Sequence, residues 1–168
     1  MTTECGQELL EELRGREHSR CVACGSPTGA AARLRFRVRE DGGVEGWFPP
    51  SPLHQGYDGI LHGGVIATLL DAAMTNCLFA HGCSGVTADL HVRFRHPVVA
   101  DQPSWLRAEI ERSLPPLFVL RAELLQNGRC HATAVGKFMD RRDPMVAAQG
   151  RGFPADSADG GSRPATAT

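Results

Sequence analysis

An acidic residue interrupts the most apolar segment of the sequence, and this combination constrains the fold more than any other feature. Residues 65–80 place Val, Ile, Leu, Met, Phe, Cys and Ala around the whole circumference of a helix, with Asp71 in their midst. A helix that is apolar on all sides is expected to be enclosed by protein. Burying a polar group without a partner costs about 1–3 kcal/mol, and a lone carboxylate costs more, so Asp71 must be well paired or functional.

Length and composition fit one soluble domain. The 168 residues are 42% hydrophobic and 22% charged, with a formal net charge of −1. Lys and Arg are scattered rather than clustered, so we expect no nucleic acid and no membrane surface as partner. The polar stretch 1–20 has no apolar signal-peptide core, and no run reaches the roughly 18 apolar residues of a membrane span, so we expect a cytoplasmic protein.

The cysteines are too few for a disulfide framework in a chain without a signal peptide: Cys5, Cys21, Cys24, Cys77, Cys83 and Cys130. Cys21 and Cys24 form a CxxC pair, which suits a plain turn, a metal site or redox chemistry. A structural zinc site takes four ligands, usually from two paired motifs, and there is no second CxxC; His18 and His54 are unpatterned candidates to complete it. A plain turn is the favoured interpretation, and we expect no metal and no cofactor.

Hydrophobic periodicity predicts β-strands on both sides of one long helix. Period-2 alternation predicts strands at 33–39 and 44–48, followed by a loop over 49–61 and the apolar helix from about 63 to 80. The same alternation and the turn signals between the runs predict four more strands, at 89–95, 105–111, 117–125 and 130–139. A curved antiparallel sheet wrapped around the single helix is the economical arrangement, so we predict an α+β hot-dog fold.

The domain organisation follows from the same patterns. We expect an N-terminal lead-in helix within residues 1–20, built on Leu9, Leu10 and Leu13, and a hot-dog domain over residues 21–145. Residues 146–168 are rich in Gly, Ala, Pro, Ser and Asp with almost nothing to bury, and predict a disordered tail.

Two sequence strings carry a family resemblance. His62-Gly63-Gly64 stands nine residues before Asp71, and residues 85–98 read GVTADLHVRFRHPV. Together they resemble the hot-dog acyl-CoA thioesterases of the phenylacetate-pathway (PaaI-like) and THEM-type groups, over about residues 21–140. The resemblance implies an acyl-CoA substrate, a homodimer or a dimer of dimers (a homotetramer), Asp71 as general base or nucleophile, and the backbone N–H of Gly63 as oxyanion donor.

Elementary geometry supports this assignment and adds a condition. A glycine-rich helix start exposes backbone N–H groups without intrahelical partners, and the helix dipole favours negative charge there. Gly63 and Asp71 are eight residues apart, which is about 12 Å along one helix, so one thioester carbonyl cannot touch both. Two antiparallel helices of a symmetric pair would bring Gly63 of one copy opposite Asp71 of the other, so catalysis predicts a dimer.

Supporting roles are expected for several neighbours. Gly64 follows the oxyanion donor and is expected to contact substrate. Thr75 lies four residues beyond Asp71 on the same helix face, where its hydroxyl could position water. The resemblance adds a hydroxyl at Thr87. Thr75 and Thr87 could equally be ordinary core residues whose hydroxyls are hydrogen-bonded within the protein.

The residues before the helix leave two questions open. His62 is a candidate catalytic group, although a structural role in fixing the loop that presents Gly63 is favoured. Several relatives place Asn or Gln six residues before this His, where the present chain has Gly56. Gln55 could substitute if the loop shifts, as substrate- or water-binding residue.

Substrate contacts and rival functions also stay open. Phe79, Met74, Leu78 and Phe118 suit an acyl pocket or ordinary core. The cations that could hold CoA phosphates equally suit solvated surface positions: Arg93, Arg95, Arg107, Lys137, Arg141 and Arg142. The alternatives to a thioesterase are a non-catalytic acyl-CoA-binding or sensing module and a hot-dog hydratase or dehydratase, which usually pairs a catalytic His with an acid at another spacing.

Overall fold

The computed structural model describes residues 2–25 and 34–149. Its elements in chain order are α1 (Thr3–Glu17), β1 (Phe36–Val38), β2 (Val44–Phe48), the 3-10 turn η1 (Pro52–His54), β3 (Gln55–Tyr57), β4 (Ile60–Leu61), α2 (Gly63–Ala80), β5 (Gly85–Phe94), β6 (Ser104–Leu114), β7 (Leu117–Gln126), β8 (Arg129–Asp140) and α3 (Pro144–Gln149).

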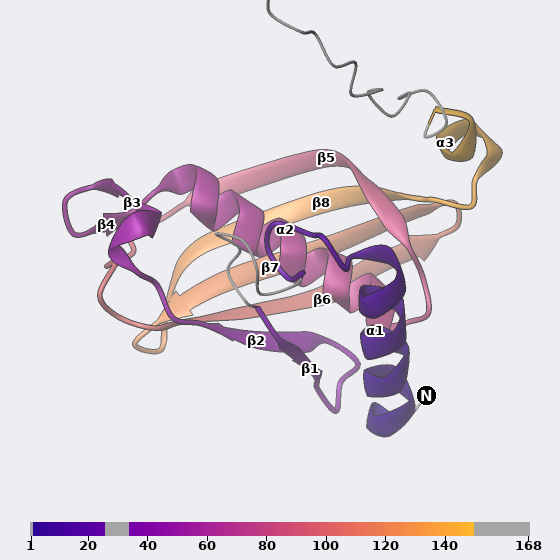
Figure 1. Cartoon of the computed structure of the whole chain (residues 1–168), viewed down its shortest axis with the longest axis horizontal. Coiled ribbons are helices and arrows are strands. Elements are labelled where there is room, and N and C mark those ends of the chain that lie inside the picture. The colour runs from indigo at the N-terminus through magenta and orange to yellow at the C-terminus, as the bar shows by residue number, and fades with distance from the viewer. Residues whose placement is uncertain (1, 26–33, 150–168) are drawn as a thin grey trace, which may run out of the picture.

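Six strands form one antiparallel sheet in the order β1-β2-β6-β7-β8-β5, and α2 packs across one face of it (Figure 1). The predicted hot-dog fold is therefore confirmed. In Figure 1 the β3–β4 hairpin lies at the start of α2 and α1 lies near its far end. The two ends of α2 thus have different surroundings, which matters for the candidate site.

Local sequence chemistry accounts for most elements. In the first hairpin Phe36 and Val38 are buried and Arg37 between them is exposed, as alternation predicts. The β7–β8 turn holds Asn127 and Gly128 at φ 51° and 75°, the left-handed conformations that an Asn-Gly hairpin turn requires.

Two segments differ from the sequence prediction. The predicted loop 49–61 contains η1 and the β3–β4 hairpin. Strand β5 is the last strand of the sheet, and its apolar residues are incompletely covered: Phe94 is 54% exposed and Val86 39%. The alternation in this strand predicts that its apolar side chains face the core. An edge strand, however, has a neighbouring strand on one side only, so its side chains are less covered.

Helix α2 is enclosed only in its second half. Residues 72–80 are buried, and Leu10 and Leu13 of α1 pack into the same core. In the first half Gly64 and Thr68 are exposed and Asp71 is partly exposed, and these positions form one stripe along the helix. The expectation of an all-round enclosed helix is therefore wrong for residues 64–71. By length and composition α2 could cross a membrane, yet 67% of it is buried in this protein.

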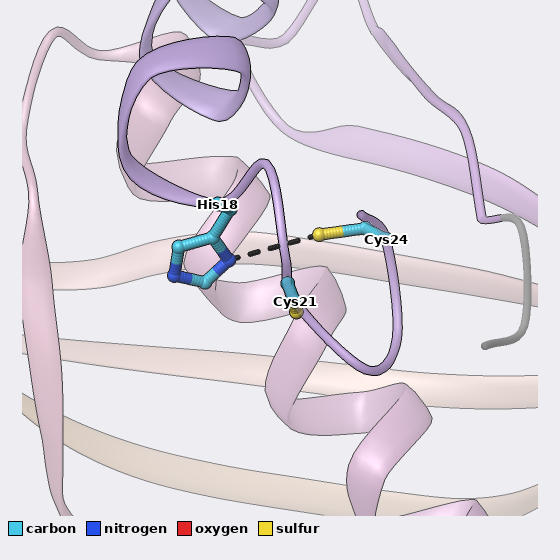
Figure 2. A group of neighbouring side chains, drawn as sticks. All are labelled: His18, Cys21 and Cys24. Atoms are coloured by element: carbon cyan, nitrogen blue, oxygen red, sulfur yellow. Dashed lines mark hydrogen bonds between the residues drawn. The ribbon is translucent and has the colours of Figure 1, made fainter. Parts of the chain in front are cut away.

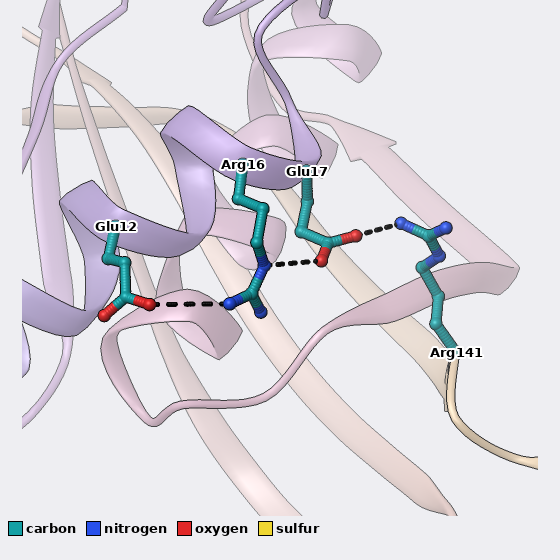
Figure 3. Close-up of polar contacts among 4 residues, drawn as sticks. All are labelled: Glu12, Arg16, Glu17 and Arg141. Atoms are coloured by element: carbon teal, nitrogen blue, oxygen red, sulfur yellow. Dashed lines mark hydrogen bonds and ion pairs between the residues drawn. The ribbon is translucent and has the colours of Figure 1, made fainter.

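Ion pairs join α1 to the end of β8. Glu17 accepts hydrogen bonds from Arg16, at 3.1 Å, and from Arg141, and Arg16 also pairs with Glu12 (Figure 3). Exposed pairs contribute about 0–1 kcal/mol each, so burial of the leucines of α1 is the larger stabilising effect. Of the predicted disordered tail, residues 146–149 lie in α3 and residues 150–168 lie outside the described part of the chain.

Candidate active site

The start of α2 presents an unpaired backbone donor. His62 is the N-cap residue: its Nδ1 accepts a hydrogen bond from the amide of Gly64 at 2.9 Å, and its own amide donates to the His54 carbonyl at 2.9 Å. Within the described residues the amide of Gly63 has no hydrogen-bond acceptor. His62 thus occupies Nδ1 in capping the helix, and Gly63 holds the free N–H at the positive end of the helix dipole.

An apolar groove of about 590 Å³ opens beside Gly63. Its lining is mostly aliphatic and aromatic, and includes Ile60, Leu61, Ile66, Phe94, Pro97 and Val98. Phe94 is so close that a Cβ added to Gly63 would lie 3.5 Å from Cζ of its ring. A hydrophobic chain can therefore lie within reach of the Gly63 N–H.

Asp71 lies further along α2, partly buried and bonded to β5. The hydroxyl of Thr87 donates to Asp71 Oδ1 at 2.7 Å. Burial raises the pKa of Asp71 above its ordinary value, while the Thr87 hydrogen bond and the charge of protonated His18 lower it. The structure thus brings Thr87 to the carboxylate. Thr75 is buried and, within the described part of the chain, forms no hydrogen bond with Asp71.

His18 is a neighbour of Asp71 that the sequence analysis did not connect with the site. It caps the C-terminus of α1, and its ring packs edge-on against Phe79, with the ring centroids 5.0 Å apart. Burial lowers the pKa of His18, and the Asp71 carboxylate raises it. The only signal in the sequence was the position of His18 just before the CxxC pair, which says nothing about α2.

The surroundings of Gly56 and Gln55 bear on the question about the missing amide. A Cβ on Gly56 would lie 3.0 Å from His62 Cδ2, so the backbone of β3 packs too closely on His62 to leave room for a long side chain. The side chain of Gln55 accepts a hydrogen bond from the Gly59 amide at 3.0 Å and so closes its own hairpin. The side-chain oxygen of Gln55 is thus engaged within the β3–β4 hairpin.

Other predicted contacts are distributed differently. Phe79, Met74, Leu78 and Phe118 are at most 2% exposed, belong to the core and do not line the groove. Of the candidate phosphate-binding cations, Arg95 lines the groove. Four others pair with acidic residues: Arg107 with Glu45, Lys137 with Asp89, Arg141 with Glu17 and Arg142 with Asp140.

Gly63 and Asp71 do not meet within one chain. They lie eight residues apart in α2, about 12 Å along the axis, and Asp71 is not part of the groove lining. The arrangement offers an oxyanion donor with an apolar groove at one point of the helix, and a carboxylate of raised pKa at another.

Thr87→Val is expected to move the acid limb of any Asp71-dependent activity to higher pH. Burial raises the pKa of Asp71 and the Thr87 hydroxyl lowers it. Without the hydroxyl the pKa rises further, so the carboxylate becomes protonated at a higher pH. The plateau rate should fall by at most about tenfold, the value of one hydrogen bond. The measurement is kcat against pH. Thr133→Val on β8 is the hydroxyl-deletion control and should keep the wild-type profile; an unmoved limb in Thr87→Val would contradict the assignment.

Comparison with known proteins shows which proteins this chain is similar to. The sequence profile of the thioesterase superfamily matches residues 58–136, which include all of α2 and the strands from β4 to most of β8. The bovine (Bos taurus) acyl-coenzyme A thioesterase THEM4 is 41% identical over 51 residues, which are 30% of this chain. That match covers 20% of THEM4, so the chain spans about a fifth of the length of this relative.

Solved structures share the fold at low identity. The Escherichia coli PaaI protein of the phenylacetic acid degradation operon superposes with a TM-score of 0.69 at 13% identity, covering 83% of this chain and 96% of PaaI. A hypothetical thioesterase from Streptococcus pneumoniae, solved with coenzyme A, gives 0.60 at 20% identity over 64% of this chain and 87% of that one. These two structures confirm the hot-dog fold. The profile match and the match to THEM4 agree with the resemblance stated from the sequence strings.

Proposed function

We propose that this chain, whose residues 58–136 match the sequence profile of the thioesterase superfamily, hydrolyses acyl-CoA thioesters to the free acid and CoA. The observation that carries this proposal is the partly buried Asp71, which accepts a hydrogen bond from Thr87. It lies partly exposed on the stripe of α2 that also holds Gly64 and Thr68, on the helix that begins at the free N–H of Gly63. Such a carboxylate has a structural cost that packing alone does not repay.

The chemistry needs only these groups. The thioester carbonyl oxygen accepts a hydrogen bond from the Gly63 N–H, which stabilises the charge that develops on it. Asp71 removes a proton from a water molecule whose oxygen attacks the carbonyl carbon, or attacks that carbon itself. The tetrahedral species then collapses, the C–S bond breaks, and CoA leaves as its thiolate. In the second route water hydrolyses the resulting anhydride.

The edge strand β5 supports a shared site between two copies. Thr87 of β5 lies beside Asp71, and Phe94 of β5 lies beside Gly63. If two β5 edges pair antiparallel about a two-fold axis near Leu90, the Thr87 end of one copy faces the Phe94 end of the other. Asp71 of one copy then approaches Gly63 of the second, and an exposed edge strand gains its missing partner.

Substrate recognition is proposed from the groove. Its apolar lining suits an acyl or aryl chain, and Arg95 at its wall supplies a cation for a CoA phosphate. The coenzyme A in the streptococcal structure supports this choice of substrate class.

Thiol release from a panel of short, medium, long-chain and aryl acyl-CoAs tests the proposal. We expect saturable formation of free CoA with at least one member of the panel. Saturable binding of acyl-CoA without thiol release would favour the sensing module, which the absence of an amide at Gly56 makes the second candidate. Addition of water across an enoyl-CoA without thiol release would favour the hydratase.

A further inference from the structure

A second cluster of chemically capable side chains lies where α1 ends. The ligand atoms of His18, Cys21 and Cys24 all lie within 4.8 Å of one another, and Cys24 Sγ is 3.7 Å from His18 Nδ1. Figure 2 shows the three side chains converging from a single turn of the chain. We propose that this turn binds one zinc ion through an imidazole nitrogen of His18 and the sulfurs of Cys21 and Cys24.

The backbone holds the three ligands together in the absence of an ion. The amide of Cys21 donates to the His18 carbonyl at 3.0 Å, and the amide of Gly25 donates to the Cys21 carbonyl at 2.8 Å. A Cβ on Gly25 would lie 2.5 Å from the backbone of Cys21, so the turn is tight enough to require glycine there. The ligands are thus prepositioned, which lowers the entropic cost of binding the ion.

Helix α2 supplies a polar group behind the cluster. Asn76 is fully buried, its Nδ2 donates to the Ala72 carbonyl at 2.8 Å and contacts Cys24 Sγ at 3.7 Å, and its Oδ1 has no partner in the described part of the chain. A buried amide with one unmet acceptor is costly in an apolar core. Its N–H against the Cys24 sulfur is the kind of outer contact that orients a thiolate ligand.

The ligand chemistry favours zinc over redox exchange. Two thiolates with one imidazole are a set typical of zinc. A redox-active thiol needs exposure, whereas Cys24 is 2% exposed. On binding, the two thiols release their protons to solvent and the ion takes their place.

The fourth coordination position is assigned to water. Residues 26–33 contain no His, Cys, Asp or Glu. His54 is not among the described residues whose ligand atoms gather here, and its Nδ1 accepts a hydrogen bond from the Ser51 amide at 2.9 Å. Three protein ligands with water in the fourth position occur at catalytic zinc sites, including sites with two thiolates and one imidazole. The ion would fasten the end of α1 against the second half of α2.

Metal content of the full chain tests the proposal. The protein is produced with zinc in the medium, kept reduced and dialysed into metal-free buffer, and zinc is measured by mass spectrometry. We expect about one zinc per chain, retained by Cys5→Ser, whose thiol is exposed on α1, and lost from Cys21→Ser and from His18→Gln. Cobalt in place of zinc should give a thiolate-to-metal charge-transfer band in the wild type and Cys5→Ser only.

Three outcomes would overturn it. One is a folded, reduced wild-type protein that retains no zinc and gives no cobalt band. Another is equal zinc content in the wild type and both ligand variants, which would place the ion elsewhere. The third is a Cys21–Cys24 disulfide in the freshly isolated protein, seen as a mass lower by two hydrogens, which would assign the pair to redox chemistry. Circular dichroism of both ligand variants separates loss of metal from loss of fold.

Discussion

Asp71→Asn is expected to lower kcat for thioester hydrolysis by about 10²–10⁴-fold, with KM changed only a few-fold. Asparagine has the shape of aspartate and its Oδ1 can still accept the hydrogen bond that Thr87 donates. It cannot take a proton from water or attack a carbonyl carbon. Steady-state thiol release with the best substrate of the panel measures the effect.

The same variant carries its own folding control. Because the fold raises the pKa of Asp71, the native state binds more protons at this site than the unfolded chain does. Stability therefore falls as pH rises from the ordinary carboxyl value of 3.8 through the raised one. Asp71→Asn removes this loss, so its Tm at neutral pH should equal or exceed that of the wild type. A stable variant with more than a tenth of wild-type kcat would exclude Asp71 as the base.

Gly63→Pro is expected to lower kcat by about 10²–10³-fold through loss of one oxyanion donor. Proline has no N–H, yet it is favoured at the first position of a helix, which Gly63 occupies. The preceding residue must be extended, and His62 already is, with φ −64° and ψ 135°. The substitution therefore deletes the donor with little change to α2. It is measured as kcat with the same substrate, alongside the helical circular dichroism signal.

Gly63→Ala is the matched control for this variant. It keeps the N–H, and its Cβ meets only the Phe94 ring at 3.5 Å, an ordinary contact. We expect its kcat within a few-fold of the wild type. Equal losses in the alanine and proline variants would mean that crowding of the groove, and not the missing donor, lowers the rate.

Local sequence patterns predicted much of this fold because helix bounds and turns depend mainly on the residues within the segment itself. The bounds of α2 follow from an apolar run that begins after the His62 cap, and the β7–β8 turn follows from Asn127 and Gly128. The family resemblance singled out Thr87 as a supporting hydroxyl, but neither the resemblance nor periodicity predicted its hydrogen bond with Asp71. Their contact crosses from helix to edge strand, at 16 residues' separation in the sequence.

The remaining features depend on tertiary packing. Alternation in β5 does not reveal that it is an edge strand, so the exposure of Phe94 was missed. The engagement of Gln55 with Gly59 depends on a hairpin within what reads as a loop. His18 and Asp71 are far apart in the sequence. They are neighbours only because α1 packs on α2.

Mixing two inactive variants tests the shared site most directly. Asp71→Asn and Gly63→Pro are dissociated together at equal concentrations and allowed to reassociate. Half of the dimers should be mixed, and each mixed dimer joins the intact Gly63 of one copy with the intact Asp71 of the other in one of its two sites. The account predicts recovery to about a quarter of wild-type activity. Mixed dimers detected by native mass spectrometry without activity above that of the two parents would contradict it.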